Sequence, residues 1–330
     1  MITVTGYKQY KQCPRYWCYK NIVADAKVKK DPFRREVTLL ARLQTIYAWR
    51  GTVVDNILSR YLVNAVNKRR AIDKDYFITQ AMTMFTNQLE YAVFQKYRDT
   101  GAEITNNPDF NALIECEIGN GITDEEIRNA REDIIKALTN VLEDREFMEY
   151  LQSAKNLISQ RSLTYNYDRF SVKAKPDLIA FFENDPPHIF DWKVHTYGTA
   201  TYDEQLIAYA VALFKVGHTK PHEDFPANLS KYSLYDYKLS EYQLLHKDRI
   251  KRDYTITEDQ MRDFGNNLGS AIIEMHIAGA NKKYKDIDIE AFETTQYVEN
   301  CINCGFQKIC KMGKHEIYGA KEVRDEHLQY

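Results

Sequence analysis

The sequence predicts an α/β protein in which helices flank a small mixed sheet, with a helical insertion at about residues 73–155. Residues 52–67 place apolar side chains at the three- and four-residue spacing of a half-buried helix. Residues 73–155 are charge-rich and mostly helical in pattern, whereas residues 160–194 alternate β-branched and aromatic residues with polar ones. This order of segments favours an α/β fold.

Three strands are expected in the strand-rich segment, at Ser162 to Tyr167, Phe170 to Phe182 and His188 to Val194. The sequence Asn-Asp-Pro-Pro at residues 184–187 predicts a turn between the last two of them. Residues Tyr232 to Tyr237 have the composition of a further strand.

Two capping boxes predict where later helices begin. Thr201 with Glu204 opens a helix that runs through Phe214, and Thr257 with Gln260 opens another near the end of the chain. In both, a threonine precedes an acidic or amide residue by three positions, so that side chain and backbone cap each other.

The composition is that of a soluble globular protein. The chain has 330 residues, and we expect one domain over residues 1–330. Apolar residues make up 44% and charged residues 28%, enough apolar surface for a core. No apolar run approaches the ~20 residues of a membrane helix, and the first residues lack the apolar stretch of a signal peptide. We therefore expect a cytoplasmic protein.

The net charge of −2 gives the whole chain no attraction for a polyanion, but residues 1–36 are locally basic. They hold nine Lys and Arg residues against three acids, a local charge of +6. Tyr16, Trp17 and Tyr19 lie among these cations, as in surfaces that stack bases and contact phosphates. A solvated basic face with ordinarily packed aromatics explains the same residues.

The central signal is a pair of acids with a lysine, Asp177 on one expected strand and Asp191-Trp192-Lys193 on the next. Residues two apart on a strand share a face, so Asp191 and Lys193 point the same way. If the two strands pair through the turn, Asp177 approaches Asp191. An exposed strand face with a loose ion pair is the alternative for so short a pattern.

Two carboxylates brought together repel each other unless a positive charge lies between them. A hard divalent cation such as Mg²⁺ takes carboxylate and carbonyl oxygens together with phosphate oxygens. Such an ion can activate water and stabilise charge on a phosphate during hydrolysis. Lys193 could orient the attacking water or neutralise the growing charge.

Two helices carry further candidate residues. Gln205 and Tyr209 are four residues apart, so they share one face of the expected helix. Their polar ends could reach phosphate or sugar beside the ion, although Tyr209 also suits the edge of a core. Asp55 lies at the border of the apolar stripe of the 52–67 helix, where it could bind the metal or cap the helix.

Taken in order, these segments resemble the motifs of RecB-family PD-(D/E)XK nucleases. The motifs are Gly51-Thr52-Val53-Val54-Asp55, Pro176-Asp177, Asp191-Trp192-Lys193 and Gln205-Leu206-Ile207-Ala208-Tyr209. The resemblance implies a restriction-endonuclease-like core that binds Mg²⁺ or Mn²⁺ through Asp177, Asp191 and the carbonyl of Trp192. Lys193 would be the catalytic lysine, and Gln205 and Tyr209 the family's Gln-Tyr pair. Asp55 stands where the family usually has histidine, and aspartate is the harder ligand.

The cysteines indicate a second centre. Cys301, Cys304 and Cys310 are spaced so that their thiolates can reach one metal centre. A cubane needs a fourth ligand, for which we choose Cys13, with Cys18 as the alternative. A [4Fe–4S] cluster joining both ends of the chain is expected, and zinc held by four thiolates competes with it.

The layout of one early cysteine and three late ones resembles AddB-type and CRISPR-adaptation nucleases, a subset of the RecB family. The resemblance implies an iron–sulfur DNA exonuclease acting on single strands or ends, in repair, recombination or CRISPR adaptation. No phosphate-binding Gly-Lys-Ser/Thr loop is present, so any unwinding would need a separate helicase partner.

Two other functions compete with the nuclease. A non-catalytic DNA-binding or assembly subunit could keep the nuclease scaffold, and Asp55 in place of histidine is its main support. A redox iron–sulfur protein ranks below both, because the sequence lacks features for a flavin or a docking partner.

Overall fold

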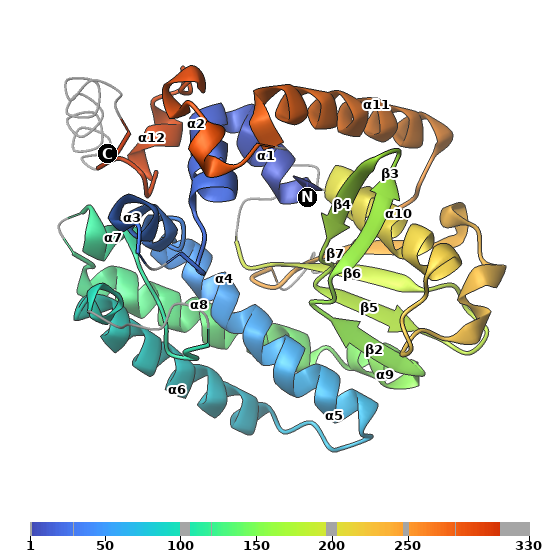
Figure 1. Cartoon of the computed structure of the whole chain (residues 1–330). Helices are drawn as coiled ribbons and strands as arrows, with labels where there is room; N and C mark the ends of the chain where they lie inside the picture. Colours follow the sequence, from blue (N-terminus) through green and yellow to red (C-terminus); the bar gives the residue numbers. More distant parts are fainter. Residues whose placement is uncertain are drawn as a thin grey trace. The chain divides into compact units, whose positions relative to one another are not determined.

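The computed structural model describes residues 2–28, 30–99, 106–119, 121–195, 203–246, 251–280 and 282–310 (Figure 1). The chain divides into two compact units. The first, here called the sheet unit, comprises Met1–Val4, Arg50–Phe85 and Arg128–Ile272. The second, the cysteine unit, comprises Thr5–Trp49, Thr86–Ile127 and Ile273–Tyr330.

All of the strands in the described residues belong to the sheet unit. They are β1 (Ile2–Thr3), β2 (Asn156–Ser159), β3 (Leu163–Tyr167), β4 (Phe170–Ala174), β5 (Leu178–Phe181), β6 (His188–Lys193), β7 (Lys238–Gln243) and β8 (Lys251–Tyr254). Five of them form a sheet in the order β2-β5-β6-β7-β8, and three form a small sheet in the order β1-β4-β3. The larger sheet is mixed, because β6 and β7 are parallel and its other pairs are antiparallel. The predicted small mixed sheet is thus present.

Helices make up most of the remaining described chain. The α-helices are α1 (Val4–Gln12), α2 (Pro14–Cys18), α3 (Pro32–Leu40), α4 (Ile46–Ile57), α5 (Val63–Asn67), α6 (Lys74–Val93), α7 (Ile114–Glu117), α8 (Asp124–Glu143), α9 (Arg145–Ser153), α10 (Asp203–Thr219), α11 (Glu258–Met275) and α12 (Glu299–Ile302). Helices α6 to α9 confirm that residues 73–155 are mostly helical. Within the described residues, no helix is long and apolar enough to cross a membrane.

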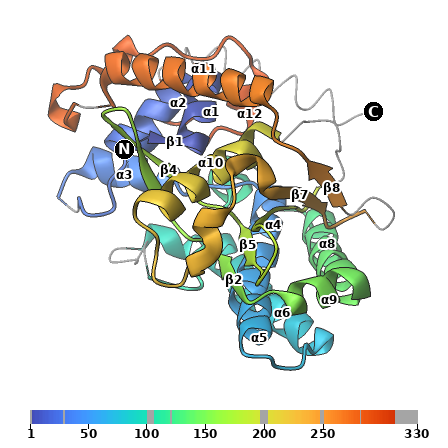
Figure 2. The ribbon, with the colours of Figure 1, turned by 90° about the vertical axis from the view of Figure 1, so that its right-hand side faces the viewer.

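Alternating residues of β6 face opposite sides of the sheet. Phe190 and Trp192 pack against Phe147 of α9, with ring centroids 5.4 and 6.0 Å away, and Tyr242 of β7 joins them. Asp191, between them in the chain, contacts α10 instead. Figure 2 shows α8 and α9 beside β7, where the Tyr242 hydroxyl donates a 2.6 Å hydrogen bond to Asp144. One face of the sheet is therefore aromatic, and the other is free to carry polar residues.

The helix predicted at residues 52–67 is present but begins earlier, at Ile46. It contains a π-helical turn, η2 (Leu58–Leu62), between α4 and α5. The C-terminal end of the run is fixed to β2, because the Asn67 side chain exchanges two 2.8 Å hydrogen bonds with the backbone of Leu157. The run therefore connects residue 55 to the edge of the sheet.

The structure corrects the strand predicted from Phe170 to Phe182. That segment forms two strands in different sheets, β4 and β5, separated at Pro176. Proline has no backbone N–H to donate to a sheet, so the ladder is interrupted there. Strand β2 was not predicted at all, because its four residues follow directly on a helical pattern.

The strand predicted at Tyr232 to Tyr237 is wrong. The structure has the 3₁₀ turns η4 (Ala227–Lys231) and η5 (Leu234–Asp236), and β7 begins at Lys238. The backbone N–H and the hydroxyl of Ser233 both donate to the Asp236 carboxylate at the start of η5, a cap that the aromatic composition of the segment concealed.

The two capping boxes fare differently. Thr257 and Gln260 bond reciprocally at the start of α11, as predicted. Thr201 lies outside the described residues, and α10 continues beyond the predicted end to Thr219.

Candidate active site and cysteine pocket

The hairpin of β5 and β6 brings Asp177 to the Asp191 segment. The two strands pair antiparallel with Leu178 opposite Phe190, and the predicted turn at residues 184–187 joins them. One carboxylate oxygen of Asp177 accepts a 3.0 Å hydrogen bond from the backbone N–H of Trp192. The predicted approach of Asp177 to the Asp191-Trp192-Lys193 segment is therefore present.

Asp191 is fully buried and surrounded by partners from two elements. Lys193, two residues along β6, forms an ion pair with its carboxylate. Gln205 of α10 donates a 3.0 Å hydrogen bond to Asp191 and lies 2.6 Å from the hydroxyl of Tyr209, one turn along the helix. The four predicted residues form one group, whereas their catalytic roles stay predictions.

Asp55 lies in the middle of a helical run, nine residues after its start at Ile46, so the alternative of a helix cap is wrong. Its Oδ1 accepts hydrogen bonds from Ser59 at 3.2 Å and from the Gln160 amide at 2.8 Å. The same Gln160 nitrogen donates to Asp177 at 3.1 Å. Asp55 is thereby connected to the other acids.

Gln160 is a member of this group that the sequence did not predict. It follows β2, the strand that no pattern predicted, and its contact with Asp177 depends on the pairing of β2 with β5. A lone glutamine after a short strand carries no signal of its own in a single sequence.

The acids of the site are held in an unfavourable electrostatic environment. Burial, and then the negative charges of Asp191 and Asp55, raise the pKa of Asp177 well above its usual range. The backbone N–H of Trp192 and the ammonium of Lys193 oppose this rise in pKa. Burial also raises the pKa of Asp55, against the hydrogen bonds from Gln160 and Ser59. A bound cation, or protons taken up by Asp55 and Asp177, would therefore stabilise this group of carboxylates.

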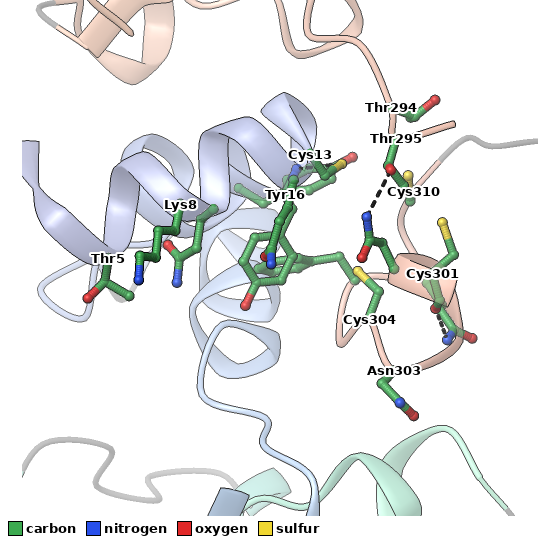
Figure 3. Close-up of a pocket in the computed structure, with 16 residues that line it drawn as sticks. Thr5, Lys8, Cys13, Tyr16, Thr294, Thr295, Cys301, Asn303, Cys304 and Cys310 are labelled. Carbon is green, nitrogen blue, oxygen red and sulfur yellow. Dashed lines mark hydrogen bonds between the residues drawn. The ribbon is translucent and has the colours of Figure 1, made fainter. Parts of the chain in front are cut away.

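The cysteine unit contains a cavity of about 360 Å³ lined by four thiols (Figure 3). They belong to Cys13, Cys301, Cys304 and Cys310, and their sulfur atoms surround a common space. The alternative fourth ligand, Cys18, is fully buried and is not among the lining residues. The structure thus groups the four cysteines that the sequence analysis chose.

Among these thiols, that of Cys304 shows a clear electrostatic effect of burial. Burial, and to a lesser extent the neighbouring thiols of Cys310, Cys13 and Cys301, raise the pKa of Cys304 to about 12. As a free thiol Cys304 therefore stays protonated at neutral pH, and a cysteine loses its proton when it binds a metal centre.

Arg15 connects the two arms that carry these cysteines. Its buried guanidinium donates hydrogen bonds to the carbonyls of Phe292 at 2.9 Å and Glu290 at 3.0 Å. Its backbone N–H donates to the carbonyl of Glu293 at 3.1 Å. The N-terminal and C-terminal arms are therefore joined by the protein itself.

The aromatics of the basic segment pack inside the cysteine unit. Trp17 and Tyr19 are 4% and 3% exposed, so they are not available to stack bases. Tyr16 and Tyr19 contact the ring of Phe306, with centroids 5.2 and 5.1 Å away. Ordinary packing is thus the correct explanation for Trp17 and Tyr19.

Comparison with known families assigns the chain. The family model of the PD-(D/E)XK nuclease superfamily matches residues 1–311, which include both groups of residues described above. The chain belongs to the PD-(D/E)XK nuclease superfamily.

Comparison with individual proteins adds little. Among solved structures, the chain is similar to protein VC1899 from Vibrio cholerae, with 11% identity and a TM-score of 0.23. The similarity covers 71% of this chain and 61% of that one, so the chain spans less than two thirds of its length. No curated protein sequence matches.

The donor set of the carboxylate site fits a divalent cation by its chemistry. Asp55, Asp177 and Asp191 offer hard oxygen ligands, and the raised pKa values of the first two show a shortage of positive charge. Among the described residues, however, no three His, Cys, Asp or Glu side chains are grouped closely enough to hold a metal ion. Gln160 stands between Asp55 and Asp177, and Lys193 and Gln205 contact Asp191. These donors would have to move for the acids to share an ion.

Proposed function

We propose that this PD-(D/E)XK protein is a Mg²⁺- or Mn²⁺-dependent deoxyribonuclease, an exonuclease that favours single strands or ends. The contact of Asp177 with the Trp192 backbone carries the proposal, because it brings both acids and Lys193 to one place on β6. The Asp-x-Lys spacing of Asp191 and Lys193 is common in sequences. Here, however, two carboxylates and one ammonium lie together in the structure.

The proposed ligands of the divalent ion are Asp55, Asp177, Asp191 and the carbonyl of Trp192. When bound, such an ion supplies positive charge beside the scissile phosphate and lowers the pKa of water. Lys193 would orient the attacking water and stabilise negative charge on the phosphate. Gln205 and Tyr209 would keep the Asp191 carboxylate oriented, as their 3.0 and 2.6 Å contacts suggest.

We also propose that Cys13, Cys301, Cys304 and Cys310 hold a [4Fe–4S] cluster in the cysteine unit. Four thiols on one cavity support a metal centre. Four sulfurs around one zinc ion would each lie ~2.3 Å from it and hence close to one another. Each thiolate of a cubane binds a different iron, so four cysteines match the four irons of such a cluster.

The local positive charge of residues 1–36 supports DNA as the substrate. Of the basic residues in the first 36, Arg15 and Arg34 bond to backbone carbonyls and so serve the fold. Lys27, Lys30 and Arg35 are exposed and remain available for phosphates. A separate helicase, or a recombination or adaptation partner, would supply the single-stranded DNA on which the enzyme acts.

The enzyme is tested with end-labelled single-stranded DNA, blunt duplex DNA and RNA, in Mg²⁺ or Mn²⁺ and in EDTA. The Lys193→Ala variant is run beside the wild type. We expect the wild type alone to shorten single-stranded DNA from its ends, and only with metal. Binding without cleavage by both proteins would support a DNA-binding subunit instead, and cleavage of RNA alone would contradict the proposed substrate.

The cluster is tested by anaerobic purification. A brown protein with a broad absorbance band near ~400 nm and about four irons per chain is expected. A colourless protein that contains one zinc per chain would contradict this part of the proposal without affecting the nuclease.

A further inference from the structure

Gln160 occupies a strained backbone position beside the acids. Its φ of 51° lies in the left-handed region, which costs a residue with a side chain on the order of 1 kcal/mol. Its backbone N–H is held by the carbonyls of Pro176 at 3.1 Å and Asp177 at 3.2 Å. Residue 160 is therefore fixed to the same short segment that carries the Asp177 carboxylate.

The side chain of Gln160 bridges two acids from different elements. Its single amide nitrogen lies 2.8 Å from Oδ1 of Asp55, on α4, and 3.1 Å from Oδ1 of Asp177, next to β5. An amide NH₂ group has two hydrogens, so one nitrogen can serve both oxygens at once. The bridge gives each of these half-buried carboxylates a hydrogen-bond donor.

A divalent cation held between the Oδ1 atoms of Asp55 and Asp177 would use the oxygens that the bridge uses. A Mg²⁺ or Mn²⁺ ion that Asp55 and Asp177 held in this way would take carboxylate oxygens of both as ligands. The amide nitrogen carries hydrogens and no free lone pair for a metal, so it cannot stay between those oxygens as a ligand. Cation binding therefore displaces the amide.

We propose that Gln160 is a positioning residue of the nuclease site, an amide clasp that holds Asp55 and Asp177 together until a divalent cation takes its place. This inference rests on the metal dependence proposed above. The clasp keeps the two acids close before the ion arrives, and its hydrogen bonds must be given up when the ion binds. Gln160 thus sets how tightly the site holds its metal.

The test measures Mn²⁺ affinity by calorimetry at neutral pH, without DNA. Gln160→Met keeps the length and shape of the side chain and removes the two N–H donors. We expect it to bind Mn²⁺ about tenfold more tightly, the effect of losing one competing charge-assisted hydrogen bond. Gln160→Lys replaces the amide by a competing ammonium, so we expect about tenfold weaker binding.

The matched control is Gln80→Met in the same unit, where a glutamine of similar exposure meets Tyr61 and no acid of the site. Its Mn²⁺ affinity should equal that of the wild type. Unchanged or weaker Mn²⁺ binding by Gln160→Met would overturn the clasp, since the amide would then be a bystander or help to hold the ion. If Gln160→Met does not fold, Gln160→Lys decides alone, and unchanged or tighter binding there contradicts the inference.

The failure of the clasp can be distinguished from the failure of the proposed metal dependence. A wild type that binds no Mn²⁺ overturns both the clasp and the metal dependence. A wild type that binds Mn²⁺ with the same affinity as both variants of Gln160 overturns the clasp alone.

Discussion

The carboxylate site and the cysteine pocket each gather residues that are far apart in the sequence, but they are held together in different ways. In the carboxylate site the members bond to one another, as Gln160 does to Asp55 and Asp177, and Gln205 to Asp191. In the cysteine pocket the support comes from outside the thiols, from Arg15 and from the rings around Phe306.

The difference follows from charge. A buried carboxylate that ionises must find donors, because leaving it bare costs several kcal/mol, on the order of a lost charged hydrogen bond or more. A buried thiol such as Cys304, with a pKa of about 12, stays neutral and needs none. Substitutions in the carboxylate site should therefore change mainly the rate of cleavage. Substitutions in the cysteine pocket should change mainly stability and iron content.

Asp191→Asn should produce the largest effect and leave the cysteine pocket intact. It removes a proposed metal ligand and the partner of Lys193 while keeping the shape of the side chain. We expect cleavage to fall by about 10³-fold or more, as when a charged group of a catalytic centre is removed. Iron content and absorbance should not change. Loss of iron in this variant would show that the two regions are not separable in the way proposed.

Gly305→Ala should damage the other region. A Cβ on Gly305 would lie 2.8 Å from the backbone oxygen of Leu40 and 3.2 Å from the side chain of Leu43. Because a backbone carbonyl cannot turn away, we expect a loss of stability of about 3 kcal/mol, at the upper end for overpacking. A lower urea midpoint and a lower iron content measure it. Gly265→Ala is the control, since its Cβ meets nothing within 4 Å.

His188 should make the sheet unit sensitive to acid. Burial, with Lys251 next, lowers its pKa from 6.5 to about 3. The unfolded chain then takes up a proton that the folded chain refuses, so stability is full above pH 6.5 and falls as the pH drops towards 3. We expect a loss of about 2 kcal/mol by pH 5. Urea unfolding of wild type and His188→Gln at pH 7.5 and 5 checks this, and equal pH dependence in both would contradict it.

Arg15→Lys should produce the smallest of these effects, in the cysteine pocket. Lysine keeps the charge but cannot donate to the carbonyls of both Phe292 and Glu290 in the geometry of a guanidinium. We expect a loss of about 1–2 kcal/mol from one buried carbonyl left without its donor. The measurement is the urea midpoint, with Lys11→Arg at an exposed ion pair as control. If Lys11→Arg loses as much stability, the loss in Arg15→Lys does not come from the buried hydrogen bonds of the guanidinium.

Much of both regions could be predicted from local spacing. Asp191 and Lys193 share a strand face, Gln205 and Tyr209 share a helix face, and the late cysteines are close in the chain, so each set follows from periodicity. Family resemblance connected these sets across the sequence, and the grouping of Asp177 with Asp191 follows from the turn between their strands.

What could not be predicted depends on pairing between distant segments. Gln160 reaches the acids only because β2 pairs with β5, and no local pattern marks β2. The expected strand across Pro176 is broken because one segment supplies two sheets. Trp17 and Tyr19 gave no sign of whether they face solvent or core, since their neighbours in space come from the other end of the chain.

The π-helical turn at Leu58–Leu62 has a consequence for how this chain can vary in length. Beyond the turn, Asn67 is locked to Leu157; before it, the helix presents Asp55. A wide turn of this kind accommodates one extra residue, and deleting any one of its five positions would restore an ordinary helix. The residues upstream would then keep nearly the same orientation relative to Asn67, because the residue removed is the extra one that the wide turn absorbs. A frame-preserving loss of one codon here would therefore leave Asp55 facing its partners, whereas a loss that the turn does not absorb would rotate it by about 100°, the angle per residue in an α-helix.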